Sequence, residues 1–99
     1  MKIRKSVLQE ALKVLGKVVS QTSPVEVQRS VRFLDVGAQV WLTATDGVES
    51  VTVEVIGDAG ELEEFAVEYK ALRELIRSTR GGEVEVTGKR LDWPEPETV

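Results

Sequence analysis

The residues of this 99-residue sequence best suited to chemistry are basic side chains in two short segments. Residues 1–21 carry five lysines and arginines against one glutamate, and residues 69–81 carry four against one. These segments hold +4 and +3 while the whole chain holds −4, so the other residues together carry −11. Basic groups set apart from acidic ones in this way are typical of surfaces that bind phosphate.

The spacing of these residues places them on the outer faces of two amphipathic helices. At 100° per residue, the basic residues between Lys70 and Arg80 fall within an arc of about 80°, nearly opposite Leu72, Leu75 and Ile76. Six side chains are therefore predicted to bind the phosphates of a nucleic acid without reading its sequence: Lys13, Lys17, Lys70, Arg73, Arg77 and Arg80. The competing interpretation is that both stripes are ordinary solvated helix faces.

Other kinds of chemistry find little support in the composition. The sequence has no cysteine and no histidine, which removes the thiol nucleophile, the thiolate zinc site and the commonest general base at neutral pH. We therefore expect no catalytic residue, no metal and no cofactor, and a carboxylate-only enzyme is kept as the least favoured hypothesis. Trp41 and Trp93 are too few and too far apart for a base-stacking platform and are expected to pack or to form an interface. No apolar run approaches a membrane span, so we expect a cytoplasmic protein with no membrane contact.

Apolar periodicity predicts helices over residues 7–20 and 69–79. Ser6 to Gln9 fits a capping box at the start of the first helix, and Gly81-Gly82 fits a left-handed cap after the second. Alternating apolar residues predict short strands at 2–4, 27–36, 40–45, 51–55, 64–67, 83–87 and 89–93. The length suits one domain over residues 1–93, followed by a flexible proline-containing tail at 94–99.

A shift of 64 residues superimposes the first strand and helix on the later strand and helix. It aligns Ile3 with Val67, Leu8 with Leu72 and Glu10 with Glu74. The fold class predicted is α+β, with two β-α-β-β-β units and two helices on one face of antiparallel sheets. A complete second unit would end near residue 120, at about the same shift, so the second unit is incomplete. The chain is then either a natural minimal form or a piece of a longer one.

Three stretches carry a resemblance to a known family. They are MKIRKSVLQEALKVLGKVVSQTSP at the start, LTATDGVESVTVEV at 42–55 and EFAVEYKALRELIRSTRGGEVEV at 64–86. From Met1 to about Val86 the chain resembles one domain, most like the N-terminal one, of the bacterial sliding clamp, the beta subunit of DNA polymerase III.

The resemblance implies a function as well as a fold. Clamp domains of that family assemble into rings whose helices face duplex DNA, so it implies a DNA-binding replication processivity factor that is not an enzyme and that self-associates. It places the six basic residues toward the DNA. DNA polymerase is implied as a partner by resemblance only, because the family's polymerase-binding cleft lies between later domains. The alternative is a clamp-fold protein-interaction or oligomerisation domain without DNA binding.

Overall fold

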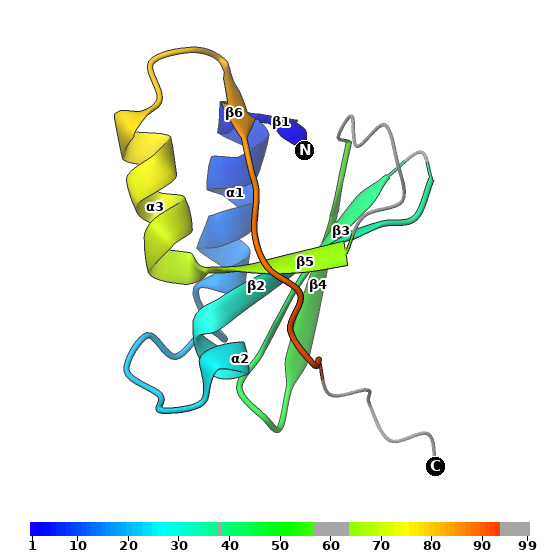
Figure 1. Ribbon diagram of the computed structural model, residues 1–99, viewed down its shortest axis with the longest axis vertical. Coiled ribbons are helices and arrows are strands. Elements are labelled where there is room, and N and C mark those ends of the chain that lie inside the picture. The colour runs from blue at the N-terminus through cyan, green and yellow to red at the C-terminus, as the bar shows by residue number, and fades with distance from the viewer. Residues whose placement is uncertain (38, 57–63, 94–99) are drawn as a thin grey trace.

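Strands flank the two main helices in the order that the repeat predicts (Figure 1). The structure is a computed structural model that describes residues 1–37, 39–56 and 64–93, so the predicted tail at 94–99 lies outside the described residues. Its elements are β1 (Lys2–Arg4), α1 (Lys5–Leu15), α2 (Glu26–Arg29), β2 (Ser30–Asp35), β3 (Val40–Thr45), β4 (Ser50–Val55), β5 (Glu64–Glu68), α3 (Tyr69–Ser78) and β6 (Glu83–Glu85). The predicted α+β class is confirmed.

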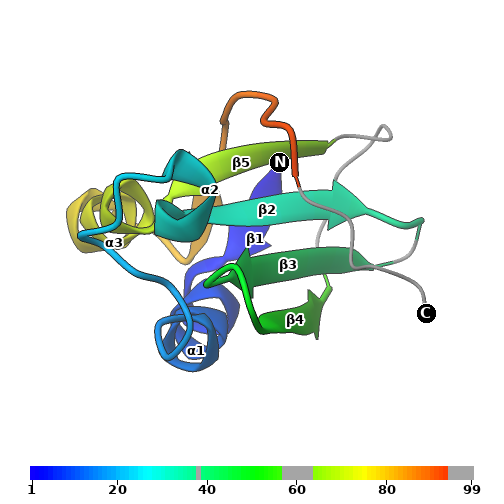
Figure 2. The same ribbon diagram turned by 90° about the horizontal axis from the view of Figure 1, so that it is seen from below.

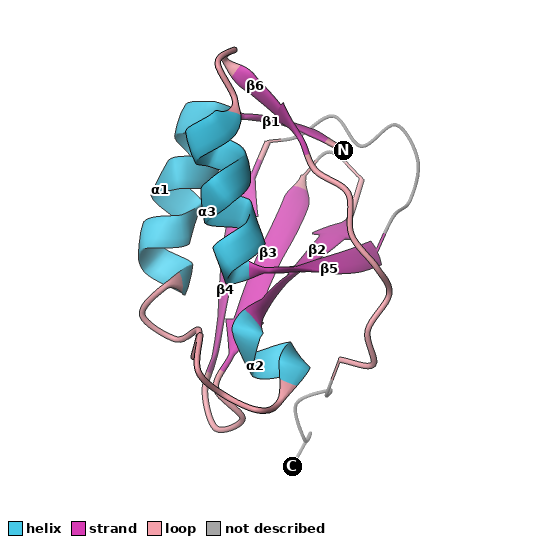
Figure 3. Cartoon of the chain, turned by 60° about the vertical axis from the view of Figure 1, so that its left-hand side comes forward, coloured by secondary structure: helices cyan, strands magenta, loops and turns pink. Residues whose placement is uncertain are grey.

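The two halves of the chain exchange strands. The larger sheet has the order β4-β3-β2-β5 and the smaller one pairs β1 with β6, all antiparallel. The first strand of each half therefore pairs with the second strand of the other half. α1 and α3 lie side by side on the same side of the sheets, with opposite chain directions (Figures 1 and 3). This arrangement holds the two helices in one fixed relation.

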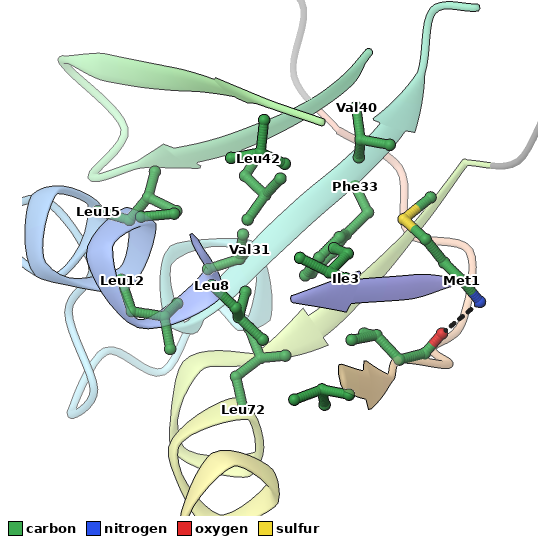
Figure 4. Close-up of a cluster of buried hydrophobic side chains, with 14 of the residues drawn as sticks. Met1, Ile3, Leu8, Leu12, Leu15, Val31, Phe33, Val40, Leu42 and Leu72 are labelled. Atoms are coloured by element: carbon green, nitrogen blue, oxygen red, sulfur yellow. Dashed lines mark hydrogen bonds between the residues drawn. The ribbon is translucent and has the colours of Figure 1, made fainter. Parts of the chain in front are cut away.

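The core lies between the helices and the inward faces of both sheets. Leu8 of α1, Val31 of β2 and Leu72 of α3 are fully buried and meet near its centre (Figure 4). Each such side chain contributes about 1.5–3 kcal/mol by leaving water. Phe33 and Phe65 stand opposite each other in the β2–β5 register with their rings stacked and the centroids 5.1 Å apart. That stack fastens β5, and with it the start of α3, to the larger sheet.

The boundaries of α1 differ from those predicted. The helix begins at Lys5, directly after β1, and no side chain caps it, so the capping box at Ser6 is wrong. The Lys5 N–H instead donates to the Gly82 carbonyl at 2.8 Å, which satisfies a first-turn donor through the sheet. The helix also ends at Leu15, five residues before the predicted end, where Gly16 is its C-cap.

Two further predictions failed locally. The strand predicted at 27–36 begins only at Ser30, because residues 26–29 form the turn of α2, and the Ser30 hydroxyl donates to the Glu26 carbonyl at 2.8 Å. The glycine cap after α3 is wrong as well. Thr79 is the C-cap, and its amide and hydroxyl both bond to the Leu75 carbonyl, so no left-handed glycine is needed.

The last strands are shorter than predicted. β6 ends at Glu85, and the segment expected as a strand at 89–93 forms a single bridge, between Lys89 and Ala66. The shift of 64 holds for the first strand and helix of each unit and then falls to 53, since Val31 pairs within β2–β5 and Val84 holds the matching place in β1–β6. The cause is the link between helix and strand, which spans residues 16–29 in the first unit and 79–82 in the second.

Candidate nucleic-acid interface

α1 and α3 present matching polar faces on the side away from the core. Glu10 and Lys13 form an ion pair of 3.3 Å on α1, and Glu74 and Arg77 form one of 3.0 Å on α3, each three residues apart. The shift of 64 residues carries the first pair onto the second. The repeat therefore reproduces surface chemistry as well as backbone structure.

The two polar faces meet in a groove between the helices, called here the helix groove. It is lined by Gln9, Glu10, Leu12 and Lys13 of α1 and by Tyr69, Arg73, Ile76 and Arg77 of α3. Leu12 and Ile76 are buried and form its floor. Three of the six predicted basic residues, Lys13, Arg73 and Arg77, are thus brought together from segments some sixty residues apart in the sequence.

The other three predicted residues are exposed but do not line this groove. Lys17 follows the end of α1 in a turn, Lys70 is in the first turn of α3, and Arg80 is in the link to β6. They extend the basic surface to the ends of the helices rather than into the space between them.

The ion pairs at the groove are weak. The side chains of Lys13 and Arg77 are 74% and 68% exposed, and their glutamate partners are exposed to a similar degree. An exposed ion pair contributes about 0–1 kcal/mol, so an incoming phosphate can displace either glutamate from its partner. Glu10 nevertheless reduces the positive charge of the groove itself.

Several basic residues of the N-terminal segment stabilise the fold instead. The Lys5 ammonium donates to the Thr79 carbonyl at 2.6 Å, at the C-terminal end of α3 where a cation is favourable. Lys2 and Arg4 stand opposite Glu85 and Glu83 in the β1–β6 register. Three of the five charges counted in residues 1–21 therefore have neighbours within the domain.

Sequence reasoning missed one residue of the groove. Gln9 lines it on α1 at the place that Arg73 occupies on α3, as the same shift of 64 could have indicated. Its amide adds a neutral donor and acceptor beside Lys13.

The remaining chemistry-bearing features do not join the groove. Trp41 lies on the outer face of β3 and is 37% exposed, and Trp93 is half-buried near the end of the described chain. Across residues 1–37, 39–56 and 64–93 there is no group of three or more potential metal ligands. Among the same residues, no helix is long and apolar enough to cross a membrane.

Two units with exchanged strands, and with their helices side by side, define the DNA-clamp fold. Solved structures with this fold include a Bartonella birtlesii DNA polymerase III subunit beta sliding clamp bound to griselimycin, with a TM-score of 0.75 at 20% identity over 88% of this chain and 24% of that one. The Pseudomonas aeruginosa DNA polymerase III subunit beta matches with a TM-score of 0.72 at 23% identity over 88% and 25%. A Helicobacter pylori beta clamp bound to a DNA ligase peptide matches with a TM-score of 0.74 at 12% identity over 84% and 24%.

The likeness is therefore one of fold, to a single domain. The chain spans about a quarter of the length of the clamps that it matches. No protein-family model and no curated protein matches the sequence. The predicted resemblance to one sliding-clamp domain is confirmed at the level of the fold.

Proposed function

We propose that this domain is a non-enzymatic, clamp-like module of a replication processivity factor and that it associates with the backbone of duplex DNA. The observation that carries the proposal is the convergence of Lys13, Arg73 and Arg77 in the helix groove. All three are exposed cations on rigid helices, which suits contact with phosphates rather than with base edges. Lys17, Lys70 and Arg80 extend the same surface.

The charge of the groove sets the strength of this association. Three cations that each neutralise one phosphate give a log–log salt slope of about −2.7, and four contacts from one domain give no more than about −4. Binding is then sequence-independent and weak, with a dissociation constant on the order of 10⁻⁴ M or higher for one domain. Self-association would raise it by joining several basic faces.

The second candidate function is a clamp-fold interaction or oligomerisation domain without DNA binding. The net charge of −4 and the position of Glu10 within the groove favour it. DNA polymerase is the partner that the family resemblance suggests in either case. The two candidates separate on whether the groove arginines matter for DNA.

Fluorescence anisotropy with a labelled duplex, over a series of salt concentrations, tests the proposal. Arg73→Gln/Arg77→Gln should abolish measurable binding while changing the free energy of unfolding by less than about 0.5 kcal/mol per site. Gln39→Glu/Val48→Glu lowers the net charge by the same amount at exposed hairpin positions and should leave binding nearly unchanged. Equal loss in both variants, or binding that ignores salt, would replace the proposal by the second candidate.

A further inference from the structure

β4 is an edge strand, and its outer edge has no backbone partner among the described residues (Figure 2). The Asp46 N–H donates to the Glu49 carbonyl at the hairpin, and bonded pairs recur at every second residue of an antiparallel ladder. Val51, Val53 and Val55 therefore direct their backbone groups to β3. The N–H and C=O groups of Ser50, Thr52 and Glu54 point away from the sheet.

The opposite edge of this sheet is protected. The Ala66 N–H of β5 donates to the Lys89 carbonyl at 2.8 Å, and the Lys89 N–H donates back at 3.1 Å. β4 contains no lysine, proline or bulge, which are the features that usually keep an edge strand from pairing. Val48 and Ile56, at its two ends, are 92% and 81% exposed. An edge with these properties favours a further strand.

We propose that the β4 edge pairs with the β4 edge of a second copy of this chain, antiparallel, about a twofold axis through Thr52. Only residues with outward backbone groups can bond across the axis. A register centred on Thr52 uses all of them, with Thr52 opposite Thr52 and Ser50 opposite Glu54. A shift by two residues would leave one of the three without a strand partner.

The side chains agree with this register. On the inner face, half-buried Val51 would stand opposite Val53 of the other copy and complete its burial. On the outer face, the hydroxyls of Thr43 and Thr52 already bond at 3.0 Å, and the twofold axis would continue this pair into a row of four threonines. Each Glu54 would face a serine, so no like charges meet.

Charge also selects a second β4 over the other acidic edge of the chain. β6 has Glu83 and Glu85 on its outward positions, and β4 would bring Glu54 close to both. Such a head-to-tail contact repels, whereas the twofold pairing does not. The axis is perpendicular to the sheet, so both helix grooves would lie on one side of a continuous sheet. The pairing itself does not depend on DNA binding.

Analytical ultracentrifugation of the full chain and two matched lysine variants tests the pairing. Thr52→Lys places two lysines opposite each other and should raise the dimer dissociation constant by about fivefold. Ser50→Lys, on the same face of the same strand, places each lysine opposite Glu54 and should lower it by about fivefold. Only a monomer at high concentration, a tighter dimer with Thr52→Lys, or equal effects of both changes would overturn the proposal.

Cysteine cross-linking tests the register, since the chain has no cysteine of its own. Thr52→Cys should form a dimer with a short thiol cross-linker, because bonded antiparallel partners have Cα atoms about 5.5 Å apart. Ser50→Cys alone should not, since two such residues would lie about 13 Å apart along the strands. A mixture of Ser50→Cys and Glu54→Cys should cross-link again. Dimers from Ser50→Cys alone would contradict the axis at Thr52. Arg73→Gln/Arg77→Gln should dimerise normally, which separates this test from that of DNA binding.

Discussion

The hydroxyl oxygen of Tyr69 lies so close to Gly16 that a Cβ atom at residue 16 would come within 2.5 Å of it. The same hydroxyl donates to the Leu12 carbonyl at 3.2 Å. The first residue of α3 is thereby locked against the last turn of α1. Since Lys13 lies in that turn and Arg73 one turn after Tyr69, this contact sets the width of the helix groove.

Gly16→Ala should therefore destabilise the domain by about 1–3 kcal/mol, although alanine is the better helix former. The Cβ atom has no room beside the Tyr69 ring and the Leu12 carbonyl. Urea unfolding measures the change. Gly81→Ala is the matched control, because a Cβ there meets nothing within 4 Å, and it should be neutral or slightly stabilising.

Tyr69→Phe should cost about 0.5–1.5 kcal/mol, the net value of the lost hydrogen bond. Combined with Gly16→Ala it should cost less than the sum, because removing the hydroxyl oxygen takes away the nearest clash. A double-mutant cycle in urea gives the coupling energy directly. Strict additivity would mean that the backbone at Gly16 moves away without Tyr69.

Gly88→Ala should release the segment 87–93 from β5. A Cβ at residue 88 would clash with the Ala66 carbonyl and with the side chains of Phe65 and Val67. Hydrogen exchange of the Ala66 amide reports the contact, since its N–H donates to Lys89. Its exchange should accelerate by more than tenfold relative to core amides such as that of Phe33. An unchanged rate would show that the segment tolerates the extra carbon.

Asp46 should contribute an acid-sensitive part of the stability. The N–H groups of Glu49 and Val48 donate to its carboxylate at 2.7 and 2.8 Å and hold its pKa below the ordinary value of 3.8. A lowered folded-state pKa stabilises the fold above pH 3.8, and this stabilisation is lost as the pH falls through the folded-state pKa. The stability advantage over Asp46→Asn should shrink over that range. A carboxyl titration by NMR with a midpoint at or above 3.8 would contradict the assignment.

The parts of the fold that the sequence predicted depend on local periodicity. The bounds of β3 and β4 and the start of α3 follow from alternation or from an amphipathic face, which a short window shows. The end of α1 depends on Tyr69, 53 residues beyond Gly16, and on packing that no local pattern contains. α2 is held by the short polar contact between Ser30 and Glu26 within a stretch whose β-branched residues favour a strand.

The candidate site divides in the same way. A helical wheel places Lys13, Arg73 and Arg77 on outer faces, but it cannot show that two helices lie side by side and enclose a groove. The charge count also treated Lys2, Arg4 and Lys5 as free cations. Their partners are Glu83, Glu85 and the Thr79 carbonyl, all more than seventy residues away in the sequence.

Removal of the two groove-side glutamates should strengthen DNA binding. Glu10→Gln/Glu74→Gln frees Lys13 and Arg77 from their exposed ion pairs, each of which contributes at most about 1 kcal/mol. Phosphate no longer competes with a carboxylate, so the dissociation constant should fall by about twofold to fivefold per site at low salt. Glu49→Gln/Glu54→Gln raises the net charge equally on exposed positions of the β3–β4 hairpin and should have a smaller effect. Anisotropy titrations compare the two variants. Equal gains would mean that DNA responds to net charge alone and that the helix groove has no special part in binding.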